Sequence, residues 1–188
     1  ATGVHWTFSP VLCIARDTRW GRVDETFGED PMLIGEMASA MVKGYQGGAQ
    51  AGETLPKDAI LACAKHFAGY SETQGGRDAS EADLSHRKLE SWFLPPFERV
   101  AKEGCGTFML GYESIEGVPV TFNKWLLTDK LRGKMEQVTG KKVELKCSVD
   151  PSIMGGIVVK VNNEQFDTSL RTRLEELAAR LTGTQESR

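Results

Sequence analysis

The stretch ILACAKHFAGYSETQGGRD, residues 60–78, decides the fold class of this chain. Its first eight residues form an apolar run that we predict to be a buried strand. Lys65 and His66 stand near the end of that run, and a glycine-rich loop follows. Neighbouring side chains of a regular strand point to opposite faces, so we expect a bend there. Polar residues where a strand ends are typical of α/β folds, which place their sites at that edge.

Strands and helices alternate on both sides of this stretch. We predict further strands over residues 6–15, bent at Pro10, and over 107–112. Helices are predicted over residues 31–45, 86–103 and 123–132, the second of them interrupted at Pro95-Pro96. In the first helix we expect one apolar stripe, made of Met32, Leu33, Met37, Met41 and Val42.

The alternation of strands with helices predicts parallel strands joined by right-handed crossovers. Both a (β/α) barrel and an open α/β sheet fit that order. A complete eight-stranded barrel needs about 250 residues, whereas this chain has 188. The predicted fold class is therefore α/β, with a partial (β/α) barrel of parallel strands and helices.

The chain changes character near residue 133. Residues 1–133 carry 14 of the 15 aromatic residues and a net charge of −4, from 14 basic and 18 acidic side chains. Residues 134–188 carry one aromatic residue, Phe166, and a net charge of +1, from 9 basic and 8 acidic side chains. In this second segment we predict strands over 142–149 and 156–161, a turn at Asn162-Asn163, a short strand at 165–166 and a helix to residue 181. We therefore expect two domains, 1–133 and 134–188, the second a small β-hairpin plus helix unit.

Composition excludes several classes of function. The net charge of −3 gives no electrostatic reason to expect nucleic-acid binding. No apolar run reaches the roughly 20 residues that span a bilayer, and the opening residues do not resemble a signal peptide, which favours a cytoplasmic location. The four cysteines, Cys13, Cys63, Cys105 and Cys147, form no Cys-x-x-Cys pair, so we expect no metal site and no cofactor. The first three lie in or beside apolar runs and are expected in the core, with disulfides as a minor alternative.

Three places could carry chemistry, each where a predicted strand ends. The first is the loop of residues 16–22, whose three arginines and Trp20 suit a polyhydroxylated ligand. The same loop could equally be a surface loop held by its own ion pairs. The second place is Lys65-His66 with the glycine-rich loop behind it, and the third is Tyr112 after the last strand. A lone histidine is more often structural than catalytic, but the lysine and the glycines favour a functional role here.

Taken together, these motifs resemble glycoside hydrolase family 3, the β-glucosidase and β-xylosidase family. The similarity runs from about residue 3 to residue 133. The matching motifs are WTFSPVLCIARDTRWGRVDETFGEDP (6–31), ILACAKHFAGYSETQGGRD (60–78), LPPF (94–97), MLGYESIEGVP (109–119) and LLTDKLRG (126–133). The resemblance implies a β-linked glucoside or another sugar as the partner. It implies that Arg22, Lys65 and His66 hydrogen-bond the hydroxyls of a sugar in the −1 subsite, and that Tyr112 sits beside the nucleophile.

The chain departs from that family at the reacting groups. The family supplies its nucleophile from a Ser-Asp-Trp motif after LLTDKLRG, where this chain reads KMEQVTGKKVELK. The family's general acid/base and its opening barrel strands also have no counterpart in this sequence. Retaining hydrolysis uses two carboxyl groups, so we assign no catalytic residue and expect an inactive fragment that retains part of the sugar-binding subsite. Whether the chain is an enzyme at all is left open.

The tail resembles a different family, the delta subunit of bacterial ATP synthase, also called the oligomycin-sensitivity-conferring protein. The motifs are VDPSIMGGIVVKV (149–161) and the D-x-S-x-R-x-R-L pattern (167–174), within a similarity over about residues 135–181. We interpret the chain as a chimera of the two families. The alternative function is a protein-binding module of the ATP synthase peripheral stalk, with the stalk b-subunit as partner. A partial barrel leaves open sheet edges, so we also expect either a homodimer or a monomer whose tail covers one edge.

Overall fold

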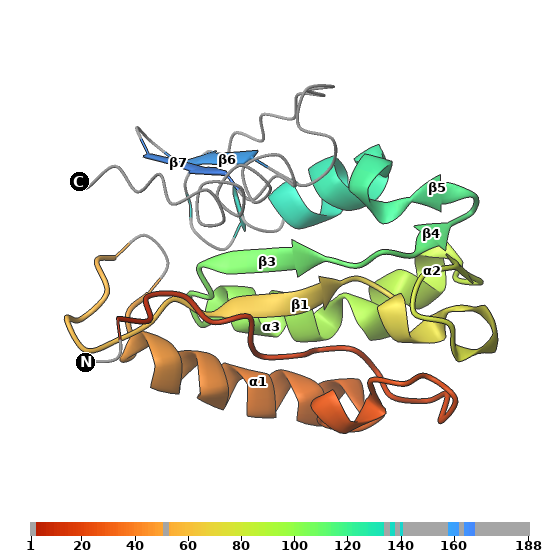
Figure 1. Cartoon of the computed structure of the whole chain (residues 1–188), viewed down its shortest axis with the longest axis horizontal. Coiled ribbons are helices and arrows are strands. Elements are labelled where there is room, and N and C mark those ends of the chain that lie inside the picture. Colours follow the sequence, from red (N-terminus) through yellow and green to blue (C-terminus); the bar gives the residue numbers. More distant parts are fainter. Residues whose placement is uncertain are drawn as a thin grey trace, which may run out of the picture. The chain divides into compact units, whose positions relative to one another are not determined.

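The computed structural model describes residues 3–50, 53–133, 136–137, 140, 158–161 and 164–167. The chain forms two compact units, Ala1–Leu145 and Lys146–Arg188, which are described separately. The first unit contains three parallel extended segments with helices packed on them (Figure 1). Its helices and strands are η1 (Val23–Glu25), α1 (Pro31–Gln46), β1 (Cys63–Phe67), η2 (Tyr70–Glu72), η3 (Gln74–Gly76), β2 (Glu81–Ala82), α2 (His86–Lys88), η4 (Leu89–Phe93), α3 (Pro95–Lys102), β3 (Thr107–Leu110), β4 (Ser114–Ile115), β5 (Val118–Pro119), η5 (Val120–Phe122) and η6 (Trp125–Arg132).

The sheet that positions the site is built from β1 and β3, which pair in parallel with Cys63 opposite Thr107. The N-terminal segment, residues 4–15, runs parallel along the other side of β1 and bridges to it at Trp6 and at Val11. This segment is extended where we predicted a strand, but only these two bridges form. Pro10 contributes no backbone N–H donor, so a continuous ladder is interrupted at the predicted bend.

Helix α1 confirms the predicted helix over residues 31–45. The Asp30 carboxylate accepts a hydrogen bond from Leu33 N at 2.8 Å, Pro31 opens the first turn, and Gly47 ends the helix with a φ of 63°. These are standard helix-start and helix-stop residues.

The predicted apolar stripe of α1 is wrong in all but one member. Val42 is buried, whereas Met32, Leu33, Met37 and Met41 are between 36% and 79% exposed. The buried face is made instead of Ile34, Gly35, Ala38, Ser39, Val42 and Gln46. Small residues on this face let α1 approach α3 closely: a Cβ atom added to Gly35 would lie 3.4 Å from the Arg99 side chain. Close packing on small side chains has therefore outweighed the burial of the larger methionines.

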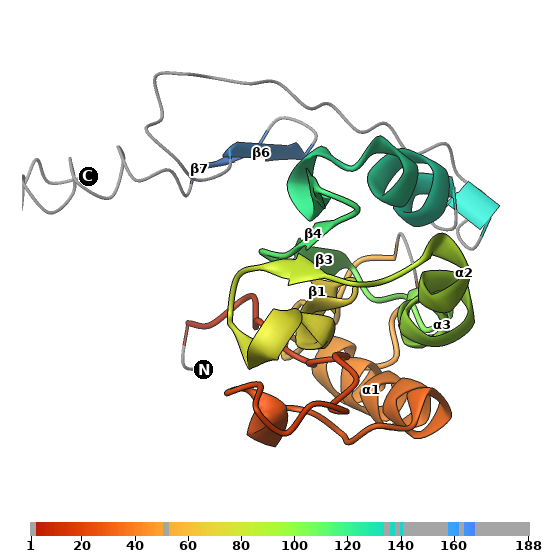
Figure 2. The ribbon, with the colours of Figure 1, turned by 90° about the vertical axis from the view of Figure 1, so that its right-hand side faces the viewer.

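The predicted interruption at Pro95-Pro96 is confirmed. Helix α2 continues into the π-type helix η4, and α3 begins anew at Pro95. The third predicted helix is η6, another π-type helix. Cys13, Cys63 and Cys105 are free and buried, as expected, whereas Cys147 lies outside the described residues. Figure 2 shows the strands between α1 below and η6 above.

A second sheet, made of three two-residue strands, lies beyond the carboxyl end of β3 (Figure 1). It has the order β2–β4–β5, with β2 parallel and β5 antiparallel to β4. The Glu81 carboxylate fastens it by accepting hydrogen bonds from Ser114 Oγ at 2.5 Å and from Gly117 N at 3.1 Å. This sheet fixes the backbone directly after Tyr112.

The second unit contains one described hairpin, of β6 (Val158–Val161) and β7 (Glu164–Asp167), which pair antiparallel. It confirms the hairpin predicted around Asn162-Asn163. The strand predicted over 142–149 and the helix predicted up to residue 181 lie outside the described residues. Among the helices that the structure describes, none combines the length and apolarity required to cross a bilayer.

Candidate functional site

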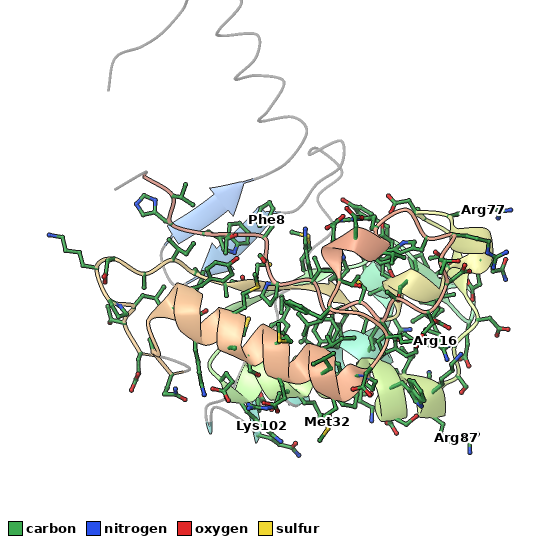
Figure 3. The ribbon with its side chains drawn as sticks, turned by 90° about the horizontal axis from the view of Figure 1, so that it is seen from below. Phe8, Arg16, Met32, Arg77, Arg87 and Lys102 are labelled. Atoms are coloured by element: carbon green, nitrogen blue, oxygen red, sulfur yellow. The ribbon has the colours of Figure 1, made fainter. Side chains whose placement is uncertain are left out.

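The candidate site lies where β1 and β3 end, at the right-hand side of Figure 1. Two loops meet there, the arginine loop of residues 16–22 and the glycine-rich loop that follows β1. They are held against each other at Gly76, where an added Cβ would come within 2.5 Å of the Arg19 carbonyl carbon. In Figure 3 Arg16, Arg77 and Arg87 all lie at this end of the unit, with Arg77 and Arg87 at opposite sides of it.

Each arginine of the first loop forms an ion pair with a carboxylate. Arg16 pairs with Glu72 at 2.5 Å and Arg19 with Asp17 at 2.7 Å. The Arg19–Asp17 pair agrees with the interpretation of a surface loop held by its own ion pairs, whereas the Arg16–Glu72 pair joins the arginine loop to the loop that follows β1. Arg22 differs because its guanidinium also lies over the Tyr70 ring, 5.8 Å from the ring centroid. Of the three arginines, Arg22 is therefore the one directed into the candidate site.

Glu25 joins two of the predicted site residues. It accepts two hydrogen bonds from the Arg22 guanidinium, at 2.6 and 2.9 Å, and its Oε2 lies 3.9 Å from Lys65 Nζ. The Arg22 hydrogen bonds are the main cause that lowers the pKa of Glu25. Glu25 is thus an ionised acceptor between two cationic donors. The sequence analysis missed this role because the pairing partner Lys65 is 40 positions away.

The expected bend at Lys65-His66 is confirmed. The register of the β1–β3 ladder shifts between Lys65 and Phe67. His66 is buried, 4% exposed, and its Nδ1 lies 3.6 Å from Cys13 Sγ. Burial, followed by the nearby charges of Arg22 and Lys65, lowers the pKa of His66 to about 4. At neutral pH this imidazole is uncharged and can donate one hydrogen bond and accept another.

Tyr70 is the centre of the cluster, although it was not among the predicted site residues. Its ring makes edge-to-face contacts with His66 at 4.8 Å and with Tyr112 at 6.2 Å between ring centroids. Its hydroxyl donates a hydrogen bond to Asp78 Oδ1 at 2.7 Å. Burial and this carboxylate raise the pKa of Tyr70, so the phenol stays protonated. The sequence signal that could have identified Tyr70 as a site residue is its position directly after Gly69. In the structure Gly69 has a φ of 100°.

Trp20 does not have the role that the sequence suggested. We expected its ring to cover the apolar face of a sugar, but it is 1% exposed and packs edge-to-face against Tyr70 at 5.6 Å. Together with Val11, Cys13 and Tyr70 it forms a small core cluster beneath the site. The exposed aromatic ring at the site is Tyr112, which is 73% exposed.

Glu113, the residue after Tyr112, is a fully buried carboxyl group with no hydrogen-bond partner for either oxygen. Burial raises its pKa to about 8, so the protonated form prevails at neutral pH. The sequence analysis counted it only as one of several nearby carboxylates. The Glu113 carboxyl group packs closely against the backbone of Gly111. A Cβ added to Gly111 would overlap it, so only glycine fits at that position.

The structure therefore brings all four predicted site residues into one cluster. Arg22 and Lys65 meet at Glu25, and His66 and Tyr112 meet at Tyr70. Two cationic donors, an uncharged imidazole, a carboxylate acceptor and an exposed ring form a surface suited to vicinal hydroxyl groups. Within the described ranges, no three His, Cys, Asp or Glu side chains come together as a metal ion would require.

Comparison with known proteins identifies the family. The family profile described as the glycosyl hydrolase family 3 N-terminal domain matches residues 1–165. A β-xylosidase of Formosa agariphila is 42% identical over 72% of this chain and 19% of its own length. A lysosomal β-glucosidase of Dictyostelium discoideum is 38% identical over 72% of this chain and 17% of its own length.

Two solved structures share the fold. The structure of a β-glucosidase involved in saponin metabolism from intestinal bacteria has a TM-score of 0.70 and 95% identity, covering 72% of this chain and 18% of that one. The β-glucosidase of Listeria innocua has a TM-score of 0.65 and 43% identity, covering 70% and 18%. These likenesses confirm the predicted α/β fold, a partial (β/α) barrel. The chain spans about a fifth of the length of the relatives it matches. It belongs to glycosyl hydrolase family 3, and the part that matches is the N-terminal domain of that family.

Proposed function

We propose that this chain binds a β-linked glucoside at the cluster of Arg22, Lys65, His66 and Tyr112 without hydrolysing it. The observation that carries the proposal is the convergence of these four side chains on Tyr70 and Glu25 at the ends of β1 and β3. Relatives whose names describe them as β-glucosidases and β-xylosidases support a sugar as the ligand class.

Each group has a distinct role in such binding. The Lys65 ammonium and the Arg22 guanidinium donate hydrogen bonds to sugar hydroxyls, and the ionised Glu25 accepts one. The neutral His66 adds a further donor or acceptor from the buried side of the cluster. The exposed Tyr112 ring packs against the apolar face of a pyranose. Both cations are already partly neutralised by Glu25, so we expect weak binding.

The same geometry argues against turnover by this chain. Retaining hydrolysis uses a nucleophilic carboxylate and a protonated acid about 5–5.5 Å apart. Glu25 is ionised and held by Arg22, so it has no proton to give. Glu113 holds a proton, but its side chain is fully enclosed by protein. No Ser-Asp-Trp motif follows residue 133 in the sequence.

The experiment measures binding and turnover separately. Release of nitrophenol from an aryl β-glucoside should be undetectable. Methyl β-glucoside should shift the NMR signals of the glycine-rich loop. The shifts should give a dissociation constant in the millimolar range, which corresponds to a binding free energy of about −4 kcal/mol. Lys65→Ala should abolish the shifts, and the exposed Lys57→Ala should leave them unchanged. Turnover that co-purifies with the chain and is lost in Lys65→Ala would overturn the proposed inactivity; absence of shifts would overturn the binding.

A second proposed function concerns the tail. We propose that residues 135–181 form a delta-subunit-like module that binds the b-subunit of an ATP synthase stalk, and that the chain is a fusion of two families. The support is the separate compact unit Lys146–Arg188 and its antiparallel β6–β7 pair, whose strands flank positions 162 and 163. The family 3 profile extends to residue 165, across part of the same region. Capture of a b-subunit by the full chain, lost when residues 167–174 are scrambled, would support this second function.

We also propose that copies of the chain associate with each other. Among the described residues of the first unit, three parallel extended segments leave two outer sheet edges, which in a closed barrel would meet. Sedimentation velocity over a hundredfold range of concentration should show a rising average mass; a constant monomer mass would refute the association.

A further inference from the structure

Cys13 contacts His66 twice beneath the candidate site. Its Sγ accepts a hydrogen bond from His66 N at 3.5 Å and lies 3.6 Å from Nδ1 of the His66 ring. Among the described residues, the Cys13 thiol makes no other hydrogen bond. Both residues are only 4% exposed, so their polar groups depend on each other rather than on water.

The parallel pairing of the N-terminal segment with β1 places the thiol beside this ring. Lys65 N donates to Pro10 O at 3.0 Å, and Leu12 N donates to Lys65 O at 2.6 Å. Cys13 follows directly, and its side chain packs in the small core cluster beneath the site. The backbone and the core together therefore fix where the Sγ atom lies relative to the imidazole.

Both groups are uncharged at neutral pH. Burial raises the pKa of the Cys13 thiol to about 12. Burial, together with the charges of Arg22 and Lys65, lowers the pKa of His66 to about 4. The thiol therefore keeps its S–H, and the imidazole carries one proton, on either Nδ1 or Nε2.

The hydrogen-bond contacts distinguish these two forms of His66. With the proton on Nδ1, the Cys13 sulfur would accept from two N–H groups, and its own S–H would have no acceptor among the described residues. With the proton on Nε2, the S–H donates to Nδ1, and the sulfur accepts only from the His66 backbone. Each of the two donors in the contact then has an acceptor, and a ring nitrogen is a better acceptor than a thiol sulfur.

The second ring nitrogen of His66, Nε2, is left for a ligand. It makes no hydrogen bond among the described residues, and it does not belong to the fully enclosed side-chain atoms that lack a partner. Arg22, Lys65 and Glu25 are close enough for their charges to act on the ring. A proton on Nε2 thus gives the cluster a third donor beside the two cations, with Glu25 as the acceptor.

We propose that Cys13 is a positioning residue: its thiol donates to His66 Nδ1 and holds the imidazole in the Nε2–H form, as a hydrogen-bond donor toward the ligand. Cys13 acts through His66 and does not touch the ligand itself. The form of the ring follows from the Cys13–His66 contact alone, whereas its use by a glucoside rests on the sugar binding proposed above. With three donors and one acceptor, the cluster selects ligands whose oxygens accept hydrogen bonds more than they donate them.

Nitrogen-15 NMR of the full chain at neutral pH, without ligand, tests the form of the ring. In the wild type the His66 ring should show a protonated Nε2 and a Nδ1 signal displaced by an accepted hydrogen bond; the signals missing from His66→Gln identify this ring. Cys13→Ser should keep both features, because its hydroxyl can also donate. Cys13→Val should return the Nδ1 signal to that of a ring nitrogen without a donor.

Cys105→Val is the matched control. Cys105 is also a buried cysteine, but its Sγ contacts the carbonyl oxygens of Ala62 and Thr107, so the substitution should leave the His66 signals unchanged. A protonated Nδ1 in the wild type would overturn the proposal, and that reading does not depend on how any variant folds. The same Nδ1 signal in the wild type and in Cys13→Val would also overturn it.

Titration with methyl β-glucoside tests whether the form of the ring matters for binding. Cys13→Val should raise the dissociation constant by about three- to tenfold, the effect of one neutral hydrogen bond, and Cys13→Ser should restore nearly the wild-type value. Unchanged affinity in Cys13→Val would overturn the positioning role while leaving sugar binding standing. If the wild type binds no glucoside but shows the Nδ1 hydrogen bond, the sugar-binding proposal fails and the assigned form of the ring stands.

Discussion

Glu113 shows how a single residue can set the pH response of this fold. Its carboxyl group is fully buried without a partner, and its pKa is raised from about 4.5 to about 8. Between these two values the folded chain holds a proton that the unfolded chain releases. The contribution of Glu113 to the free energy of unfolding must therefore fall as the pH rises across this window.

We predict that Glu113→Gln removes this dependence. In the wild type the contribution of Glu113 to stability should decrease by roughly 2–5 kcal/mol between pH 4.5 and pH 8. The glutamine cannot ionise, so that decrease should vanish. Urea denaturation at half-unit pH intervals measures it, with the exposed Glu29→Gln as control. A wild-type loss of stability between pH 6.5 and pH 8 that persists in Glu113→Gln would contradict the assignment.

At the level of residues, the sequence predicts which side chains belong to the site better than it predicts which side chains are buried. Arg22, Lys65, His66 and Tyr112 were identified from motifs, and the structure brings them together. Trp20, Tyr70 and Glu113 were misjudged or missed, because their roles depend on which neighbours enclose them. Trp20 and Tyr70 are 50 positions apart yet form one small core cluster, and nothing local in the sequence records that contact.

Helix α1 ends on a side chain that ties three elements together. Gln46 is buried; its Nε2 donates to Gly104 O at 2.8 Å, and its Oε1 accepts from Ala62 N at 3.2 Å and Gly106 N at 3.1 Å. These backbone groups lie just before β1 and β3. One amide therefore aligns the starts of both strands with the end of the helix.

We predict that Gln46→Leu destabilises the chain by roughly 2–4 kcal/mol, because it leaves these buried backbone groups without partners. Thermal denaturation measures the loss. Gln50→Leu, at an exposed position four residues on, should change stability little. Equal effects of the two substitutions would show that the Gln46 hydrogen bonds do not align the strands.

The glycine-rich loop gives a second prediction at the level of elements. Gly75 and Gly76 both have positive φ, 69° and 72°, but only Gly76 has a neighbour in the space of a Cβ atom, the Arg19 backbone. Gly75→Ala should cost about 1 kcal/mol of stability through its conformation alone. Gly76→Ala should cost roughly 2–4 kcal/mol, since it also separates the two site loops. Chemical denaturation of both variants measures the two losses of stability. A larger loss of stability in Gly75→Ala than in Gly76→Ala would refute the loop contact.

Elements were predicted well where local signals dominate. Pro31 predicted the start of α1, which ends one residue beyond the predicted Tyr45, and Pro95 marks the start of α3. The stripe of α1 was wrong because apolar spacing does not reveal which face has small residues that allow close packing. The N-terminal strand is reduced to two bridges because Pro10 interrupts it, which the sequence indicated only as a bend.

At the scale of the whole molecule, two buried groups with opposite shifts should produce a stability plateau. The pKa of His66 falls from about 6.5 to about 4 on folding, so its contribution to stability rises with pH between these values. The contribution of Glu113 falls between about 4.5 and 8. The two slopes oppose each other from pH 4.5 to 6.5. Stability should therefore be nearly constant there and decrease on either side.

Urea denaturation at pH 4, 5.5, 6.5 and 8.5 tests the plateau. In Glu113→Gln the opposing slope is gone, so stability should rise from pH 4.5 to 6.5 and then stay level. The ion-paired Glu25 and Glu103, whose pKa values are lowered by Arg22 and Arg99, add to the loss on the acid side. A wild-type maximum above pH 8 would contradict the pairing of His66 with Glu113 as opposing groups.

At the scale of the whole chain, the sequence predicts the order of the strands better than the division into compact units. The parallel order of strands and the open barrel follow from the alternation of elements and were predicted. The division of the chain was placed at residue 133 from composition, whereas the compact units divide after Leu145. Composition changes where sequence character changes, while compactness depends on which segments fold back on each other.

The thiol of Cys13 makes the interior of the site observable by a simple reagent. It accepts a hydrogen bond from His66 N at 3.5 Å, and burial raises its pKa to about 12. Alkylation needs an accessible thiolate, so iodoacetamide can label Cys13 only when the floor of the site opens. The labelling rate would thus report how often the structure opens locally beneath the proposed sugar-binding surface, and a bound glucoside that closes the site should lower that rate.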